Sequence, residues 1–169
     1  MAAMLGAMLT ERLGDGAFEI HSSGFGPVDF PAIDDAFDAM RRRGIDVSAH
    51  RSTTTTVSLI DPADLILTAE RDHVVRVAAL SPEAFRRTLT LPEFLAAAVS
   101  GEDSAIDLRT WVRSLTERRT AGGYLRAAVP EVADPTGSPQ RAFEAAVVAL
   151  EQQCREGAAL LASRFTSSS

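Results

Sequence analysis

The sequence lacks the features that mark several classes of protein. Its 169 residues include a single cysteine, which excludes a framework of intrachain disulfides and fits a reducing cytoplasm. Charged residues interrupt every apolar stretch well before about 18 residues, which excludes a transmembrane helix. The segment MAAMLGAMLTER has no basic lead and only a short apolar run, so no secretory signal is expected. All 17 basic residues are arginine, and a net charge of −6 disfavours nucleic acid as a partner.

The residues that are present fit a globular protein of one domain, predicted over residues 1–165. Hydrophobic residues make up 46% of the sequence and charged residues 24%, the balance of a chain that buries a sizeable core. The three histidines, at positions 21, 50 and 73, are widely spaced and have no cysteine partners, so no metal site is predicted. No G-x-x-x-x-G-K-[ST] or G-x-G-x-x-G motif occurs, and no cofactor is predicted.

Apolar residues at helical spacing predict the first two helices. One covers residues 1–13 and is stopped by Gly14 and Gly16. The second covers Pro31–Arg43 and ends at Gly44. Its inward face is predicted to comprise Ile33, Ala36, Phe37 and Met40. Further helices are expected at Arg71–Leu80, Pro82–Arg87, Pro92–Val99 and Pro139–Phe165.

Three short segments are predicted as strands: Phe18–His21, Asp64–Thr68 and Thr88–Leu91. The second of these is almost wholly apolar, which is typical of a strand buried on both faces of a parallel sheet. Strands that alternate with helices predict an α/β fold.

Two regions are predicted to lie outside this alternation. Residues 101–128 are expected to form an insert, in which Leu108, Trp111 and Leu115 describe an amphipathic helix. Residues 166–169 are expected to be a disordered tail.

Five segments occur in an order that is informative as a whole. They are Phe18–Gly24, Gly44–Ser52 (GIDVSAHRS), Ala63–Thr68, Thr88–Phe94 and Ala133–Gly137 (ADPTG). This order resembles the low-molecular-weight protein tyrosine phosphatases, in which a GID-S-x-H-R-S segment precedes the third strand and an Asp-Pro loop precedes the last helix. The resemblance implies a three-layer α/β fold with a short parallel sheet, flavodoxin-like winding and the architecture called phosphotyrosine protein phosphatase I-like.

The defining motif of that family, C-x5-R-S between the first strand and the first helix, does not occur in the sequence. Residues 1–14 resemble the helix that follows this loop, so the implied fold lacks its first strand. Neighbouring strands would then keep unpaired backbone groups, each costing about 1–3 kcal/mol when buried. The only cysteine, Cys154, is predicted within the last helix and has Leu160 six positions on instead of an arginine. It is therefore not expected to be the nucleophile.

The resemblance also implies a chemistry, the hydrolysis of a phosphomonoester through a cysteinyl-phosphate. A thiolate attacks phosphorus, loop N–H groups and an arginine hold the phosphate oxygens, and an aspartic acid protonates the leaving oxygen. Carried over to this sequence, Asp134 is the general acid. The alternative is that Asp134 is an ordinary turn residue ahead of a helix. Thr136 stands where the family often has an aromatic residue, so a preference for aryl phosphates is not implied.

Ser22 and His50 match positions that brace the phosphate loop in the family. Their alternatives are a loop hydroxyl that caps a turn and a histidine satisfied by a backbone group. Arg51 is either an anion contact or part of a solvated face.

Three hypotheses about activity are open at this stage. In the first, the recorded start is wrong, and an upstream strand and C-x5-R-S loop complete a phosphatase that acts on a phosphorylated protein or a small phosphomonoester. Residues 1–169 alone would then be inactive. In the second, the chain is a catalytically dead relative that binds or regulates, stabilised by a partner strand, a swapped dimer, or pairing of Phe18–His21 with Asp64–Thr68. The third, a phosphatase-like arsenate reductase, normally needs additional cysteines. A cytoplasmic protein without a membrane partner is expected throughout.

Overall fold

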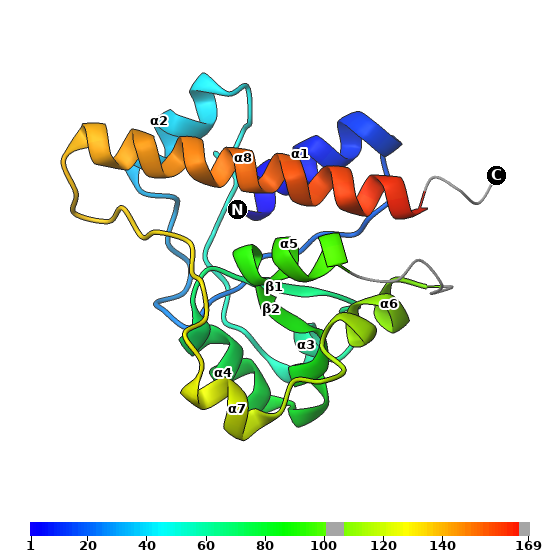
Figure 1. Cartoon of the computed structure of the whole chain (residues 1–169). Coiled ribbons are helices and arrows are strands. Elements are labelled where there is room, and N and C mark those ends of the chain that lie inside the picture. The colour runs from blue at the N-terminus through cyan, green and yellow to red at the C-terminus, as the bar shows by residue number, and fades with distance from the viewer. Residues whose placement is uncertain (101–106, 166–169) are drawn as a thin grey trace. The chain divides into compact units, whose positions relative to one another are not determined.

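The computed structural model describes residues 1–100 and 107–165, which form two compact units (Figure 1). The first unit comprises Met1–Thr54 and the chain from Ala133 onward, and the second comprises Thr55–Val132. No described helix combines the length and the apolar run that a membrane span needs. The start of the predicted insert, residues 101–106, and the predicted tail, residues 166–169, lie outside the described residues.

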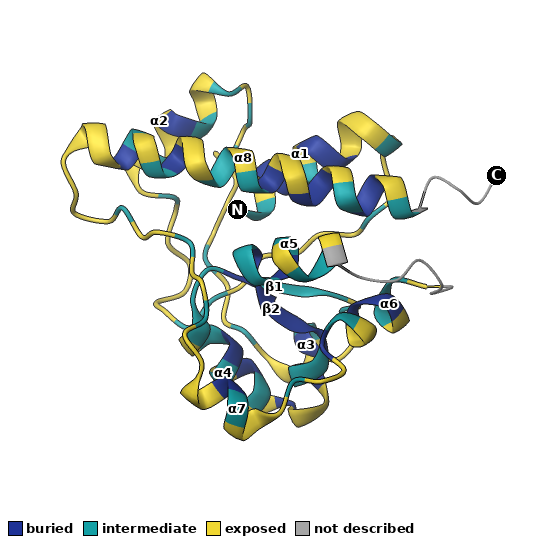
Figure 2. Cartoon of the chain, viewed as in Figure 1, coloured by how far each residue is buried: buried dark blue, intermediate teal, exposed yellow. Residues whose placement is uncertain are grey.

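The core of the first unit is formed by helices α1 (Ala2–Leu13) and α8 (Gln140–Phe165), which pack along one another. Figure 2 shows buried residues on both helices. The buried apolar side chains are Met4, Leu5, Met8 and Leu9 of α1 and Phe143, Val147, Cys154, Ala158, Leu161 and Ala162 of α8. Gly14, with a φ of 83°, ends α1 as predicted. Burial of each large apolar side chain contributes about 1.5–3 kcal/mol, so this seam is what stabilises the unit.

Helix α2 (Asp34–Arg42) starts three residues later than predicted and turns a different face inward. Its buried residue is Ala39, whereas Ile33 is 54% exposed and Phe37 is 37% exposed. The prediction that these two side chains point inward is wrong. The helical period defines an apolar stripe but does not say which neighbour covers it.

The segment Phe18–His21 is not a strand, and this prediction is also wrong. A strand exists only where a neighbour completes its hydrogen-bond ladder. Among the described residues, no backbone hydrogen bond joins Glu19–His21 to another segment. The chain instead forms an isolated parallel bridge slightly further on, between Gly24 and Thr54.

Arginine side chains connect α2 to α8. The Arg43 Nε donates to Glu151 at 2.7 Å, and its Nη2 donates to Glu144 at 3.0 Å. The Arg43 side chain is 14% exposed, and its remaining Nη1 donates to the Ala39 carbonyl at 3.0 Å. Hydrogen bonds from Arg43 lower the pKa of both glutamates. The contact between α2 and α8 is therefore stabilised by a charged side chain.

Replacing Arg43 by methionine should lower the free energy of unfolding by about 1–2 kcal/mol at pH 7, since the change removes a half-buried ion-pair network. Because the folded-state pKa values of Glu144 and Glu151 are lowered, this contribution is present above the ordinary glutamate pKa. It is lost as the pH falls through the lowered values. Urea titrations at pH 7 and at pH 3 measure both effects. The matched control is Arg41→Met, whose side chain is 71% exposed and should matter by less than about 0.5 kcal/mol.

The second unit contains a two-stranded parallel sheet. Strand β1 (Ile66–Thr68) pairs with β2 (Thr88–Thr90) in the register Ile66 to Thr88. Between them run helix α4 (Arg71–Leu80) and the 3₁₀ helix η1 (Pro82–Arg87), both at the predicted bounds. A short helix, α3 (Val57–Ile60), precedes β1, and α5 (Leu91–Ser100) follows β2. The predicted α/β fold with a short parallel sheet is confirmed, while the prediction of a single domain stays a prediction.

The described part of the predicted insert is helical. Helix α6 (Leu108–Leu115) follows the predicted amphipathic pattern, with Trp111 buried and its ring edge-on to Phe94 at 5.8 Å between centroids. Its first turn is capped by Asp107, whose Oδ1 accepts a hydrogen bond from the Thr110 N–H at 2.8 Å. A second helix, α7 (Ala121–Arg126), leads toward the segment that carries Asp134.

Candidate functional site

The segment before Asp134 is fixed to the sheet of the second unit. The hydroxyl of Thr90, the last residue of β2, donates to the Pro130 carbonyl at 2.7 Å. The Val132 N–H donates to the carbonyl of Ala69, which follows β1, at 2.9 Å. Both contacts lie at the carboxyl ends of the strands, the edge where open α/β sheets place their ligands. Asp134 follows Val132 by two residues.

The predicted acid lies in a tight turn that is open to solvent. Asp134 is exposed, and its Oδ1 accepts a hydrogen bond from the Thr136 N–H at 2.9 Å. Gly137 completes the turn with a φ of 75°, a conformation that glycine adopts without strain. The predicted turn at Ala133–Gly137 is therefore present, and Asp134 caps it with its side chain.

Hydrogen bonds from the Thr136 side chain and backbone lower the pKa of Asp134 below the ordinary aspartate value. A lowered pKa leaves the carboxyl group ionised at neutral pH. A general acid needs the opposite, a group that is protonated when the leaving oxygen develops its charge. In the state described here Asp134 is a turn-capping carboxylate, and acid catalysis would require its pKa to rise when a phosphorylated substrate binds.

Ser22 and His50, the predicted bracing residues, are both exposed. Their side chains form no hydrogen bond with any described residue. The backbone of His50 is used locally, since its N–H donates to the Val47 carbonyl at 3.0 Å and its carbonyl accepts from Arg51 at 2.7 Å. Arg51 thus binds backbone carbonyls, and the bracing role of Ser22 and His50 stays a prediction.

Ser52 organises this region through four hydrogen bonds, although sequence analysis assigned it no role of its own. Its hydroxyl accepts from the Phe30 N–H at 3.0 Å and donates to the Pro27 carbonyl at 2.8 Å. Its backbone N–H donates to the Phe30 carbonyl, and its carbonyl accepts from the Asp29 N–H, both at 2.8 Å. The only available signal is its position at the end of the GIDVSAHRS segment.

Cys154 lies in the core of the first unit and is fully buried. Burial raises the pKa of its thiol, which therefore stays protonated at neutral pH. The thiol donates a long hydrogen bond to the Met1 carbonyl, 3.9 Å from the sulfur. A buried neutral thiol is inert as a nucleophile. That Cys154 is not the nucleophile stays a prediction.

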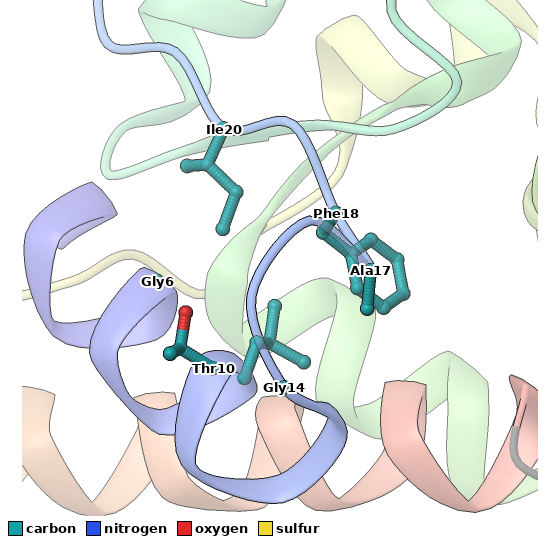
Figure 3. Close-up of a pocket in the computed structure, with 7 residues that line it drawn as sticks. Gly6, Thr10, Gly14, Ala17, Phe18 and Ile20 are labelled. Atoms are coloured by element: carbon teal, nitrogen blue, oxygen red, sulfur yellow. The ribbon is translucent and has the colours of Figure 1, made fainter.

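Two cavities of moderate size lie among the described residues, one within each unit. In the first unit, a cavity of about 250 Å³ lies between α1 and the loop Gly14–Ile20. Figure 3 shows Thr10 and Ile20 at this cavity, whose lining carries no titratable side chain. In the second unit, a cavity of about 320 Å³ borders Glu93, Arg119 and Tyr124. Those three side chains bind one another, so neither cavity offers a set of catalytic groups. Among the described residues no cluster of three His, Cys, Asp or Glu side chains is arranged to hold a metal ion.

Comparison with known proteins tests the resemblance inferred from the sequence. Residues 1–107 match the family model described as low molecular weight phosphotyrosine protein phosphatase. A search of curated proteins found no match.

Two solved structures illustrate the likeness in fold. The tyrosine phosphatase Wzb from Escherichia coli K30, solved with sulphate, is 23% identical, with 95% of this chain and 89% of that chain covered and a TM-score of 0.64. The YwlE arginine phosphatase from Geobacillus stearothermophilus is also 23% identical, with 99% and 89% covered and a TM-score of 0.70. These identities show a shared fold, and the family model extends over well more than half of the sequence. The chain belongs to the low molecular weight phosphotyrosine protein phosphatase family.

Proposed function

We propose that this chain supplies the acid-bearing loop and the helical body of a phosphomonoester hydrolase that works through a cysteinyl-phosphate. Asp134 is the general acid, and Ser22 and His50 brace the phosphate loop. The observation that carries this proposal is the segment Pro130–Val132, which bonds to the carboxyl ends of β1 and β2 and is followed two residues later in the sequence by Asp134 in an exposed turn. Residues 1–169 contain no C-x5-R sequence, so hydrolysis is not expected from them alone.

The substrate is a phosphorylated protein or a small phosphomonoester. Wzb is described as a tyrosine phosphatase and YwlE as an arginine phosphatase, and their identity to this chain is the same. Thr136 follows Pro135, where an aromatic side chain would wall a phenol ring. A substrate panel therefore includes phosphotyrosine and phosphoarginine peptides beside p-nitrophenyl phosphate. The single cysteine supports a cytoplasmic location.

The alternative is a relative that binds phosphorylated or other partners without catalysis. It is favoured by the burial of Cys154, the one cysteine in the sequence. In this alternative the segment Phe18–His21 pairs with a strand of a partner or of a second copy. An arsenate reductase is not supported, because its reductive relay normally needs further cysteines.

Purified residues 1–169 should hydrolyse p-nitrophenyl phosphate no faster than a protein-free control between pH 4 and pH 8. The reason is that a hydroxyl or carboxylate in these residues would have to replace a thiolate as the nucleophile that attacks phosphorus. Cys154→Ser is the matched variant, and it should behave like the parent chain. Turnover by residues 1–169 would contradict the proposal, and turnover lost in Cys154→Ser would identify the buried thiol as reactive.

The intact mass of the protein from its own cells separates the two functions. A mass above 18.0 kDa with a C-x5-R-S segment ahead of Met1 would support the hydrolase. A mass of 18.0 kDa would support the binding relative. The isolated native protein should hydrolyse a substrate of the panel if its mass is above 18.0 kDa, and none of them if its mass is 18.0 kDa.

A further inference from the structure

Residues 28–37 present large apolar side chains to solvent. Val28 is 51% exposed, Phe30 is 60% exposed and Ile33 is 54% exposed. Phe37 is 37% exposed and lies one helical turn after Ile33, whose carbonyl accepts from the Phe37 N–H at 2.9 Å. Side chains at this spacing are neighbours on one helix face. Single exposed apolar residues are ordinary, but four within one short segment indicate an interaction surface.

The backbone holds this segment in place. Phe30 bonds to Ser52 through both its N–H and its carbonyl, and the neighbouring Asp29 N–H donates to the Ser52 carbonyl. Phe30 therefore cannot turn inward without breaking several hydrogen bonds. A surface fixed before binding loses less conformational entropy when a partner arrives.

Two residues of the segment occupy positions that are unfavourable for the local backbone structure. Asp29 has a φ of 63°, a left-handed conformation that costs about 1–2 kcal/mol for residues other than glycine, and less for Asp and Asn. Ile33 occupies the N-cap of α2, where it makes no side-chain cap and where Ser, Thr, Asp or Asn is preferred. Neither cost is offset by burial of the adjacent apolar side chains. The backbone hydrogen bond from Asp29 to Ser52 holds the left-handed conformation, and conformations of this kind cluster at functional sites.

Carboxylates alternate in the sequence with the exposed apolar side chains. Asp29, Asp34 and Asp35 form no ion pair with any described residue. Asp34 and Asp35 also favour the helix because they lie in its first turn. Asp29 lies outside the helix, so the dipole does not explain its charge. The surface is complementary to a ligand that carries both apolar groups and cations.

We propose that residues 28–37 form a docking surface for a basic amphipathic segment of a partner protein. Aromatic or aliphatic side chains of that segment pack against Phe30 and Ile33. Its arginine or lysine side chains pair with Asp29 and with the first turn of α2. Electrostatic attraction of this kind speeds encounter, while the apolar anchors set the lifetime of the complex. This surface is independent of the activity assigned to Asp134.

The test uses the 169-residue chain and 12-residue peptides selected on it from a random library. Selected peptides should combine Arg or Lys with apolar residues, and the synthetic peptides serve as the probe in fluorescence anisotropy. The double variant Phe30→Ser, Ile33→Ser should weaken their binding at least tenfold. Asp29→Asn should weaken it about two- to fivefold, because asparagine tolerates the same backbone conformation without the charge.

Matched controls separate the surface from general effects of hydrophobicity and charge. Leu125→Ser removes an apolar side chain that is 57% exposed in the second unit, and Asp15→Asn removes one exposed charge. Neither should change peptide affinity by more than about 1.5-fold. Serine at position 33 also supplies an N-cap, so loss of folding is not expected in the double variant, and thermal unfolding checks this.

Several outcomes would overturn the proposal. They are failure to select any peptide, selection of acidic or neutral peptides, and binding that the double variant leaves unchanged. A thermal midpoint that falls sharply in both the double variant and Phe30→Ser alone would show these side chains to be structural. Sedimentation that reveals a dimer of the parent chain, lost in the double variant, would make a second copy the occupant instead.

Discussion

Replacing Arg119 by methionine should lower the free energy of unfolding by about 3 kcal/mol or more. The Arg119 side chain is 10% exposed, and its Nη1 lies 3.2 Å from Oε1 of Glu93. Its Nη2 donates to the Thr88 carbonyl at 2.8 Å and to the Phe85 carbonyl. Removal of one partner from a buried ion pair costs about 3–5 kcal/mol, because the remaining charge stays buried without compensation.

Aromatic contacts add to this cost. The guanidinium carbon of Arg119 lies 4.2 Å from the Phe85 ring centroid and 4.7 Å from that of Tyr124, so the cation is close to both rings. Methionine keeps much of the packing against the rings and loses the charge, which makes it the appropriate replacement. Unfolding in guanidinium chloride at pH 7 measures the change in the free energy of unfolding. The control, Arg118→Met, alters an exposed neighbour and should shift the free energy by less than about 0.5 kcal/mol.

A double-mutant cycle with Glu93→Gln isolates the ion pair. Glu93 also bonds the first turn of α5, accepting from the Thr90 N–H at 3.3 Å while the Thr90 hydroxyl accepts from the Glu93 N–H at 3.2 Å. Glutamine preserves this capping box and removes the charge. The double variant should lose at least about 1 kcal/mol less than the sum of the single variants. Additive losses, or an Arg119→Met effect equal to that of Arg118→Met, would show that the pair does not stabilise the unit.

Local sequence signals predicted the helices of this protein well. The bounds of α4 match the prediction, and those of α1 match to within one residue, because apolar spacing and terminal glycines act over a few residues. The face that α2 turns inward was not predictable in this way. Arg43 reaches Glu144 and Glu151 about a hundred residues away, so Ala39 becomes the inward residue and Ile33 stays exposed.

Predictions that depended on distant partners failed or stayed open. Phe18–His21 has the composition of a strand, yet a strand requires a ladder of backbone hydrogen bonds, and among the described residues Glu19–His21 form none with another segment. The role of Ser52 depends on backbone groups of Pro27 and Phe30 more than twenty residues away. For the site, the D-P-x-G pattern predicted the turn at Asp134. The direction of its pKa shift required the position of Thr136, which only the structure supplies.

In a form of this protein that carries a C-x5-R-S loop and hydrolyses p-nitrophenyl phosphate, Asp134→Asn should lower kcat by about 10²–10⁴. Asparagine can still accept the hydrogen bond from the Thr136 N–H, so the turn is expected to remain intact while the proton donor is lost. Asp15→Asn, which removes an exposed carboxylate from another loop, is the matched control and should leave kcat unchanged. An unchanged rate in Asp134→Asn would exclude Asp134 as the acid.

The pH profile gives the same assignment a second test through Thr136. Hydrogen bonds from Thr136 lower the pKa of Asp134, so the protonated, catalytically competent acid is favoured only at low pH. Thr136→Val removes the side-chain hydrogen bond and keeps the backbone one, which should raise the pKa of Asp134 toward the ordinary aspartate value. The alkaline limb of kcat/KM should then move to higher pH, and NMR titration of the Asp134 carboxyl in residues 1–169 should move in the same direction. A carboxyl pKa that rises without any shift of the kinetic limb would assign the limb to another group and leave Asp134 as a turn residue.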